Sequence, residues 1–516
     1  MILSYLNLKG LLRMNKVGII DIGAESINML LAETSEKGYF RIIDELKEHI
    51  NFGSDAISCC NISTEKMDKT IAILNIFKNM CLNAGASSIL FVASEEVRNS
   101  ESQKNFRKKL SEVLDTEFKI LSNEEDLYYS SLGATNSMFI EKSMLIDIKA
   151  YSVNLAFIEN NIIKEKAFLP FGFIDILNKF DLNNNIDFAT LANLKNYINE
   201  TLDEFKWLKE LEFDSIIGTG EAIISLGKID RAKKHYPIHV SHGYNFELND
   251  VKEIYNLIKS KDLQHRKQIS GLPKEALTSI LASASILKLI ATYINTYDIE
   301  ICGYGLREGL LFDYLESNLE SKKDILDISL TNVMDSLTIN SEHAKQVYSL
   351  SQILFDKLMP IHKLESCKFK RILKTASLLH DSGVSIRYYN HHLHSFYIVL
   401  NSPINGLSHK ELLMSAFASA LHRNNHFTVQ VAKFSSLINK LDVKYIEYIG
   451  LIIRIAEGLD RSLSSAVEIV DLELTDSTVE IIIKSDKNIE LEIQEAYRAK
   501  DLFKELYKRE LIIKKI

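Results

Sequence analysis

The feature that most restricts the fold of this chain is a strand–turn–strand pattern that occurs twice. Residues 17–34 read VGIIDIGAESINMLLAET, and residues 143–159 read SMLIDIKAYSVNLAFIE. In each segment an aspartate follows two or three apolar residues, and the apolar character resumes five or six positions later. An internal repeat of this kind predicts two similar lobes that are built around equivalent pairs of strands.

The residues around these repeats alternate between helix-like and strand-like patterns. Residues 65–84 have helical periodicity, residues 87–93 (SSILFVA) are strand-like, and a third strand–turn unit covers residues 214–228. Such alternation favours an α/β core. Residues 273–319 are helical by pattern, with an interrupting turn at 301–305.

The second half of the chain has a different pattern. Residues 325–461 are almost entirely helical by periodicity, whereas residues 467–474, 479–485 and 489–494 alternate as strands do and precede a helix near 496–508. An all-α domain followed by a small α+β domain is therefore expected. The predicted domains are two lobes at 15–136 and 137–320, the helical domain at 325–464 and the last domain at 465–516.

Size and charge limit the class of protein. At 516 residues the chain is too long for one hydrophobic core, and no run approaches the ~18 apolar residues needed to span a bilayer. The net charge of −8 argues against a nucleic-acid partner. A polyanionic ligand remains compatible with this charge, because a local basic groove can outweigh a distant acidic surface.

The N-terminal segment and the cysteine pattern both favour a cytoplasmic location. The N-terminal segment MILSYLNLKGLLRMNK has an apolar stretch but neither a basic leader nor a small-residue cleavage site, so we expect an extension rather than a signal peptide. The five cysteines are odd in number and form no CxxC pair, which is typical of free thiols in a reducing cytosol.

The first repeat contains a candidate phosphate-binding loop. Asp21, Gly23 and Ser26 follow a strand, and this arrangement suits a phosphate because glycine lets backbone N–H groups approach the oxyanion while a hydroxyl adds a donor. The aspartate can hold a metal or orient water. A hairpin turn with a solvated aspartate is the simpler alternative.

These residues resemble the actin-like phosphatases of the exopolyphosphatase / guanosine pentaphosphate phosphatase family. The first loop of that family reads roughly Asp-Leu-Gly-Ser-Asn-Ser, so this chain keeps Asp21, Gly23 and Ser26. A later segment, VASEEVR, keeps Arg98 as a phosphate contact, although a surface helix arginine is the alternative. Residues 304–311, YGLREGLL, match the family almost letter for letter and indicate a glycine turn that feeds a helix between the lobes. The resemblance implies an actin-like (ribonuclease H-like) α/β fold.

The other loops depart from the family. The second family loop, Asp-x-Gly-Gly-Gly-Ser-x-Glu, corresponds to residues 147–154, which read DIKAYSVN and lack all three glycines. The third, Gly-Gly-Thr, is Gly220-Glu221-Ala222, where a carboxylate would repel a polyanion. The resemblance nevertheless assigns phosphate binding to Asp147, Ser152 and Gly220, together with the residues of the first loop and Arg98.

The resemblance also places the catalytic carboxylates. The Glu-Glu-Ala-Arg motif of the family falls on Glu125 and Asp126, so Asp126 takes the position of the base and reaches one methylene less far. A structural alternative exists, because Ser122-Asn123-Glu124-Glu125 is a capping box that would begin a helix.

Histidines gather in the helical half and resemble an HD-type metal site. His343, the pair His380-Asp381 and then Asp460 have the order of the HD pattern, in which a divalent ion polarises phosphate and activates water. His392 and His422 are possible additional ligands. The alternative is a set of helix histidines satisfied by hydrogen bonds. Residues 377–411 also resemble the C-terminal domain of the same family.

A basic cluster precedes the His-Asp pair. Lys368, Lys370, Arg371 and Lys374 lie on neighbouring helical faces and would form either the rim of a polyanion channel or a solvated face.

The family resemblance implies hydrolysis of a phosphoanhydride in inorganic polyphosphate or in a guanosine polyphosphate such as pppGpp, with Mg²⁺ or Mn²⁺ as cofactor and a homodimer as the expected assembly. Two alternatives stay open. One is a sensor that binds such a ligand without rapid turnover, and the other is a metal-dependent phosphohydrolase at the HD-type site.

Overall fold

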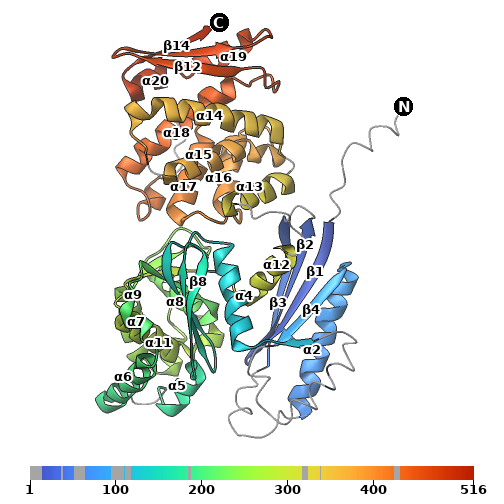
Figure 1. Cartoon of the computed structure of the whole chain (residues 1–516), viewed down its shortest axis with the longest axis vertical. Coiled ribbons are helices and arrows are strands. Elements are labelled where there is room, and N and C mark those ends of the chain that lie inside the picture. Colours follow the sequence, from blue (N-terminus) through green and yellow to red (C-terminus); the bar gives the residue numbers. More distant parts are fainter. Residues whose placement is uncertain are drawn as a thin grey trace. The chain divides into compact units, whose positions relative to one another are not determined.

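The computed structural model describes residues 14–35, 39–50, 64–93, 108, 110, 118–183, 187–316, 324–337, 339–365, 367–423 and 431–516. Arg98, Cys59 and Cys60 lie outside the described residues. The chain forms two compact units that divide between Lys323 and Asp324 (Figure 1). Each unit is described by itself.

The first unit begins with a five-stranded sheet. Its order is β3 (Phe40–His49), β2 (Ser26–Ser35), β1 (Met14–Ile22), β4 (Ser88–Ala93) and β5 (Phe118–Ile120). β1 and β2 form an antiparallel hairpin, and β4 and β5 continue the sheet in parallel with β1. Helix α2 (Thr64–Asn83) covers one face, where Leu74 and Phe77 pack on Ile20 and Met29.

A second sheet in the same unit repeats this arrangement. Its order is β10 (Asn245–Glu247), β11 (Asp298–Ile301), β9 (Ser215–Thr219), β6 (Lys142–Ile148), β7 (Val153–Glu159) and β8 (Ile162–Leu169). The hairpin β6–β7 corresponds to β1–β2, and β9 and β11 follow in parallel as β4 and β5 do. The internal repeat in the sequence is therefore the hairpin at the centre of each sheet.

Helices fill the space around the second sheet. They are α5 (Phe173–Lys179), α6 (Phe188–Asp203), α7 (Trp207–Glu210), α8 (Gly220–Lys233), α9 (Leu248–Lys259), α10 (Leu263–Arg266), η2 (Lys274–Ala276) and α11 (Ile280–Tyr293). Every residue of β7 from Val153 to Ile158 is buried, and residues 155–158 (LAFI) accordingly read as a continuous apolar run rather than an alternating one.

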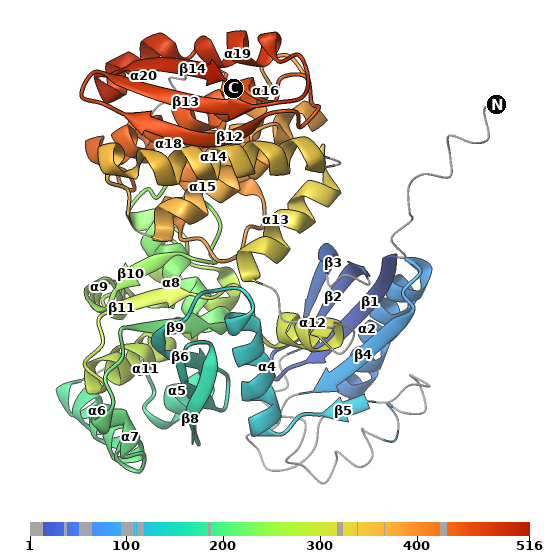
Figure 2. The same cartoon turned by 45° about the horizontal axis from the view of Figure 1, so that its top comes forward.

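Two helices cross between the sheets. α4 (Asn123–Thr135) packs Leu127 and Ala134 against residues of the second sheet, whereas α12 (Leu306–Glu316) packs Leu310 and Leu311 against the first sheet. The two helices lie side by side (Figures 1 and 2). Each helix therefore contacts the sheet of the lobe that lies farther from it in the sequence.

Glycines allow the two helices to touch. A Cβ at Gly309 would lie 1.8 Å from the carbonyl oxygen of Tyr129, and a Cβ at Gly133 would lie 2.6 Å from that of Gly305. No larger side chain fits at such backbone contacts. The sequence YGLREGLL is thus a turn and a helix that pack between the lobes, as expected from the family resemblance.

The second unit is a helical array with a small sheet. Its helices are α13 (Ile325–Ser336), α14 (Ser341–His362), α15 (Cys367–Leu379), η3 (Ser382–Ser385), α16 (His391–Asn401), α17 (His409–Ala420), η4 (Val431–Phe434) and α18 (Lys440–Gly458). They are followed by β12 (Glu468–Leu474), β13 (Thr478–Lys484), α19 (Glu490–Tyr497), α20 (Lys500–Tyr507) and β14 (Glu510–Lys515). The sheet has the order β12-β13-β14 and lies beside α14 (Figure 2).

The helices and the small sheet share one hydrophobic core. Leu354 and Ile452 from the helices belong to the same buried cluster as Ile481 and Phe503 from the C-terminal segment. The segment after residue 465 is therefore packed onto the helices within one compact unit.

One expected strand is a helix. Residues 489–494 were expected to form a strand from their alternation, but they lie at the start of α19. Ile489, Ile493 and Ala496 have helical spacing and face the core together, and this spacing, rather than the alternation of period two, matches the buried face. The strand β14 was not predicted. No helix in the described part of the chain is long and apolar enough to cross a membrane.

Candidate functional site

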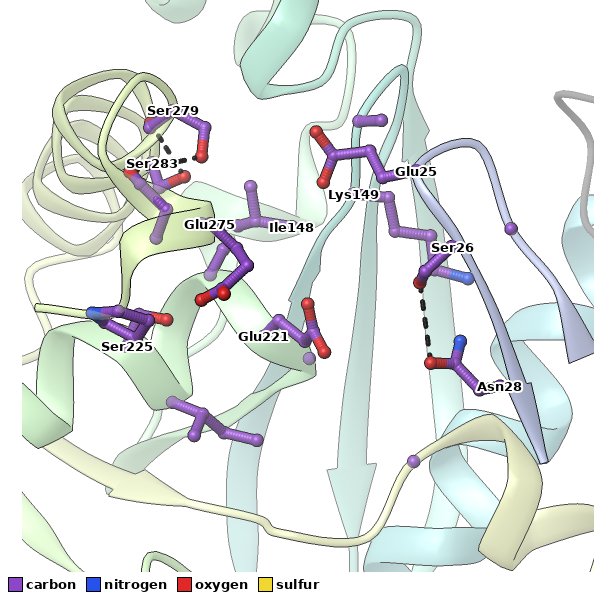
Figure 3. A pocket seen from close by; sticks show the side chains of 18 of the residues that line it. Glu25, Ser26, Asn28, Ile148, Lys149, Glu221, Ser225, Glu275, Ser279 and Ser283 are labelled. Atoms are coloured by element: carbon purple, nitrogen blue, oxygen red, sulfur yellow. Dashed lines mark hydrogen bonds between the residues drawn. The ribbon is translucent and has the colours of Figure 1, made fainter. Parts of the chain in front are cut away.

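A cavity of about 990 Å³ lies in the first unit, where the loops of the two sheets face each other. The turn after β1, the turn after β6, the start of α8, the segment around η2 and the start of α12 line this cleft. Figure 3 shows side chains from these elements around the open space.

The turn after β1 places the first predicted loop in the cleft. The Gly23 N–H donates to the carbonyl oxygen of Ser26 at 2.9 Å, which closes the turn between β1 and β2. Asp21, Gly23 and Ser26 all line the cavity. The Ser26 hydroxyl donates to Asn28 Oδ1 at 3.4 Å (Figure 3).

The turn after β6 places only part of the second predicted loop in the cleft. Asp147, Lys149 and Ala150 line the cavity, whereas Ser152 is not among the lining residues. The carbonyl oxygen of Ser152 instead accepts the Lys149 N–H at 2.9 Å and closes the turn. Within this loop, the described contact of Ser152 is structural.

The start of α8 supplies the third loop. Gly220 has a φ of +80°, and a Cβ there would lie 2.6 Å from Asp147 Oδ1. Glycine is required because a side chain would be strained and would displace that carboxylate. The next residue, Glu221, forms an ion pair with Lys47 of β3, which links the second sheet to the first across the cleft.

Asp126, Asp147 and Lys149 form a compact charged group beside the cleft. The Lys149 ammonium bonds to Asp126 Oδ1 and lies 3.6 Å from Asp147 Oδ2. The Ser130 hydroxyl lies 3.5 Å from Asp126 Oδ1 and 3.4 Å from Asp147 Oδ2. Asp126 is 3% exposed and does not line the cavity, whereas Asp147 and Lys149 do.

Burial raises the pKa of Asp147 above its ordinary value, with Lys149 acting against this rise and Asp126 adding to it. The group therefore contains a lysine between two carboxylates rather than an open pair of carboxylates. In the sequence, position 149 stood out only as one of the three missing loop glycines. The pairing of Lys149 with Asp126 and Asp147 was not predicted.

Glu125 has a structural role at the start of α4. The Ser122 N–H donates to Glu125 Oε2 at 2.8 Å, and the Glu125 N–H donates to the Ser122 hydroxyl at 3.1 Å. Lys119 Nζ lies 2.8 Å from Glu125 Oε1. The hydrogen bonds from Lys119 and from the Ser122 backbone lower the pKa of Glu125 to about 2. The capping box predicted as the alternative for this residue is present.

The lining of the cleft carries charges of both signs. The basic side chains are Lys47, Lys149, Lys228, Lys274 and Arg307, and the carboxylates are Asp21, Glu25, Asp147, Glu221, Glu275 and Glu308. Glu25, Glu221 and Glu275 lie around the open space (Figure 3). Among the residues not predicted, Arg307 lies in the matched segment 304–311 and could have been found there, whereas nothing in the sequence singled out Lys47.

Of the four predicted metal ligands in the second unit, His343, His380 and Asp381 share the spacing of a metal site, whereas Asp460 belongs to neither such set among the described residues and contacts His343. His343 Nδ1 lies 2.8 Å from Asp460 Oδ2, and His343 Nε2 lies 3.8 Å from Asp381 Oδ2. His380 Nε2 lies 3.6 Å from the same Asp381 oxygen. These residues come from the start of α14, the end of α15 and the segment after α18.

Two further histidines face the other oxygen of Asp381. His391 Nε2 lies 3.1 Å and His422 Nε2 lies 3.5 Å from Asp381 Oδ1. Each carboxylate oxygen of Asp381 thus has its own pair of imidazoles, and each set has the spacing of a metal site. His422 was expected as a possible ligand, but His391 was not. His392, the other suggested addition, belongs to neither set.

Two histidines of this cluster form a hydrogen bond with a backbone carbonyl oxygen through Nδ1. His380 Nδ1 lies 2.7 Å from the Ser377 carbonyl oxygen, and His391 Nδ1 lies 2.8 Å from that of Tyr388. A hydrogen bond at Nδ1 fixes the tautomer and leaves Nε2 to bind a metal. Burial lowers the pKa of His380 to about 4, and its buried Nε2 has no hydrogen-bond partner among the described residues.

The basic cluster before the His-Asp pair is largely engaged. Lys370 lies 3.0 Å from Asp356, Arg371 Nε donates to Glu411 at 3.1 Å, and Lys374 pairs with Asp327. These ion pairs favour the interpretation as a helix face over that of a channel rim.

Comparisons with known proteins agree across both units. The model of the Ppx/GppA phosphatase family matches residues 31–318, and that of Ppx/GppA phosphatase, domain III, matches residues 325–512. A guanosine-5'-triphosphate,3'-diphosphate pyrophosphatase of Aeromonas salmonicida is 23% identical over 396 residues, which are 75% of this chain and 77% of that protein.

Solved structures share the fold of the first unit. The PPX-GPPA enzyme of Aquifex aeolicus aligns with a TM-score of 0.53 at 20% identity, over 58% of this chain and 99% of its own. An exopolyphosphatase from Cytophaga hutchinsonii aligns with a TM-score of 0.55 at 16% identity, over 59% of this chain and 98% of its own. The expected actin-like, two-lobed α/β fold is confirmed.

Proposed function

The chain belongs to the Ppx/GppA phosphatase family, and on this basis we propose that it is a hydrolase that cleaves the terminal phosphoanhydride of a guanosine polyphosphate or of inorganic polyphosphate. The observation that carries the proposal is the cleft itself, where the turns after β1 and β6 and the start of α8 meet around one cavity. Names of similar proteins support both substrates, one as a guanosine pyrophosphatase and the other as an exopolyphosphatase.

The terminal phosphate would lie against the loops of both sheets. Gly23 and Gly220 let the backbone approach an oxyanion closely, and Lys149 adds a positive charge to the lining of the same cavity. Phosphoryl transfer depends mainly on positioning and on stabilising the charge of the reacting phosphate. These three residues would supply both effects within one cavity.

The attacking water requires a carboxylate nearby. Asp147 lines the cavity, and its raised pKa brings it closer to the range that suits a general base. Asp126 is bonded to Lys149 and would act by holding that ammonium in place. We therefore propose Asp147 as the residue that orients water and Asp126 as the residue that positions Lys149.

Phosphate release from pppGpp and from long-chain polyphosphate tests the assignment. We expect Asp147→Asn and Asp126→Asn each to lower kcat by about 100-fold. Glu125→Gln is the matched control, because this neighbour caps α4 and should leave kcat nearly unchanged. Full activity of both aspartate variants would contradict the proposal, and tight binding of either compound without phosphate release would favour the ligand-sensing alternative.

The histidine cluster supports a second candidate, a metal-dependent phosphohydrolase in the second unit. The donor set fits a divalent ion, since His343 and His380 face one oxygen of Asp381 and His391 and His422 face the other. A set rich in imidazoles favours a transition metal over Mg²⁺. A bound ion would polarise a phosphate and lower the pKa of a water.

The double variant His380→Ala/Asp381→Ala separates the two candidates. Loss of phosphate release in this variant, with activity retained in Asp147→Asn, would assign catalysis to the second unit. The reverse result would assign it to the cleft of the first unit.

Two further expectations stay proposals. A cytoplasmic location is supported by Cys81 and Cys302, which are buried free thiols, and burial raises their pKa to about 11 and about 12. Fractionation of cells tests the location. The proposed homodimer is tested by the mass of the protein in light scattering.

A further inference from the structure

The position between Asp126 and Asp147 has the oxygen donors of a cation site. Asp126 Oδ1, Asp147 Oδ2 and the Ser130 hydroxyl approach one another, and two carboxylates with a hydroxyl are ligands that Mg²⁺ and Mn²⁺ accept. The Lys149 ammonium lies among these atoms, bonded to Asp126 and 3.6 Å from Asp147. A divalent ion would need the same space.

The backbone holds Lys149 in this place from both sides. Its N–H donates to the Ser152 carbonyl oxygen at 2.9 Å, and its own carbonyl oxygen accepts the Phe173 N–H at 2.9 Å. Its side chain is only 19% exposed. A lysine on a free loop would swing into solvent, whereas this one is anchored two residues after the aspartate that it faces.

We propose that the Lys149 ammonium takes the place of a protein-bound divalent cation in the cleft of the first unit, so that this cleft binds a phosphate chain without such an ion. The proposal rests on the function proposed above and specifies its cofactor requirement. Because Lys149 also lines the cavity, a phosphate that reaches these loops meets a fixed positive charge.

Within the described ranges, the sets of side chains with metal-ligand spacing both contain Asp381 and both lie in the second unit. The divalent ion implied by the family therefore has a fitting donor set in the second unit, while the equivalent charge in the first unit belongs to a side chain.

Mn²⁺ alone is the first probe, because its binding needs neither substrate nor activity. The full chain with His380→Ala/Asp381→Ala, which removes the ligands of the second unit, is titrated with Mn²⁺ and followed by electron paramagnetic resonance. We expect this parent to bind no ion in the cleft. Adding Lys149→Ala should create one Mn²⁺ site per chain, and adding Asp147→Asn to that variant should remove it.

Lys228→Ala is the matched control, since Lys228 lines the same cleft from α8. It should create no Mn²⁺ site. The proposal is overturned if the parent already binds one Mn²⁺ that Asp147→Asn removes. It is equally overturned if Lys149→Ala creates no site, because the two carboxylates would then not form the cation site that Lys149 is proposed to fill.

Stability in Mn²⁺ gives a second readout if Lys149→Ala is weakly folded. The melting temperature of this variant should rise with Mn²⁺ in the His380→Ala/Asp381→Ala background, and that of the parent should not. Lys149→Arg keeps a positive charge and should behave as the parent does. A rise in all three proteins would overturn the proposal.

Inorganic tripolyphosphate separates this proposal from the proposed function. The parent should bind it in EDTA by calorimetry, and Lys149→Ala should bind at least tenfold more weakly in EDTA. A titration in Mn²⁺, which tripolyphosphate chelates, measures binding of the metal complex. Absence of binding in every condition would count against the proposed function, while the Mn²⁺ titration would still decide the role of Lys149. Equal binding by the parent and by Lys149→Ala in EDTA would overturn the role of Lys149 alone.

Discussion

Each unit holds an aspartate among ionisable side chains, but the partners of Asp147 and Asp381 differ. Asp147 shares a lysine with Asp126, so a positive charge is built into the chain. Asp381 faces four imidazoles, of which His380 is kept neutral by burial. A carboxylate in a low-dielectric environment needs a cation. In the first unit a side chain supplies it, whereas the second unit has the donor set to recruit one from solution.

The difference teaches that cofactor requirements can change through one residue of a turn. The two units need not share a metal dependence even though they belong to one family chain. We therefore expect different effects on the stability of the two units. Trp207, the single tryptophan, lies in the first unit, so its fluorescence reports the unfolding of that unit.

The largest expected effect is on the first unit. Lys149→Ala should lower its free energy of unfolding by about 3 kcal/mol, because Asp126 and Asp147 would stay buried without a counter-charge. Urea unfolding followed by Trp207 fluorescence measures this. Lys47→Ala is the control, since its partner Glu221 is 70% exposed and such pairs contribute about 0.5 kcal/mol. An equal loss of unfolding free energy in Lys149→Ala and Lys47→Ala would contradict the role of Lys149 as the counter-charge of two buried carboxylates.

The next effect concerns the second unit and the removal of metal. Mn²⁺ at about 100 times its dissociation constant should stabilise this unit by about 2.7 kcal/mol, and EDTA should remove that gain. Calorimetry should show a shift of one transition, while the transition reported by Trp207 stays in place. The shift should vanish in His380→Ala/Asp381→Ala. A metal-dependent shift of the Trp207 transition instead would reverse the roles of the two units.

The smallest expected effect on stability concerns Glu125, the neighbour of Asp126 in α4. The pKa of Glu125 in the folded protein is about 2, below the ordinary 4.5, so its contribution is present above pH 4.5 and is lost as the pH falls towards 2. Its side chain is 39% exposed, and screening by solvent limits the contribution to about 1 kcal/mol.

Glu125→Gln should therefore lower the free energy of unfolding at about pH 7 and less so at about pH 4. Urea unfolding at the two pH values measures the difference. Glu124→Gln is the matched control, because Glu124 lies in the same first turn without the capping contact. A loss for Glu125→Gln that does not diminish on acidification would assign the residue another role.

The sequence predicted the features that depend on neighbouring residues. The apolar runs on both sides of Asp21 and Asp147 define hairpins that need no distant partner to be recognised. The capping box at Ser122 and Glu125 is likewise local. The resemblance to known phosphatases extended this to the order of the lobes and to the grouping of His343, His380, Asp381 and Asp460.

Contacts between distant elements were not predictable in the same way. Lys149 and Asp126 are separated by 23 positions and lie on a turn and a helix, so nothing in either segment indicates their pairing. His391 was missed because its place near His422 depends on how α16 packs on α17. The strand expected at 489–494 failed because a short run with apolar residues at several spacings satisfies both periodicities.

The crossed helices α4 and α12 determine how the cleft can change its width. Each helix packs on the opposite sheet, and close backbone contacts at Gly309 and Gly133 leave no room for a side chain between the helices. A change in the width of the cleft would have to keep this backbone contact or break it. One added methyl group at Gly309, which follows the cleft residues Arg307 and Glu308, would collide with the Tyr129 carbonyl oxygen and force α12 and α4 apart.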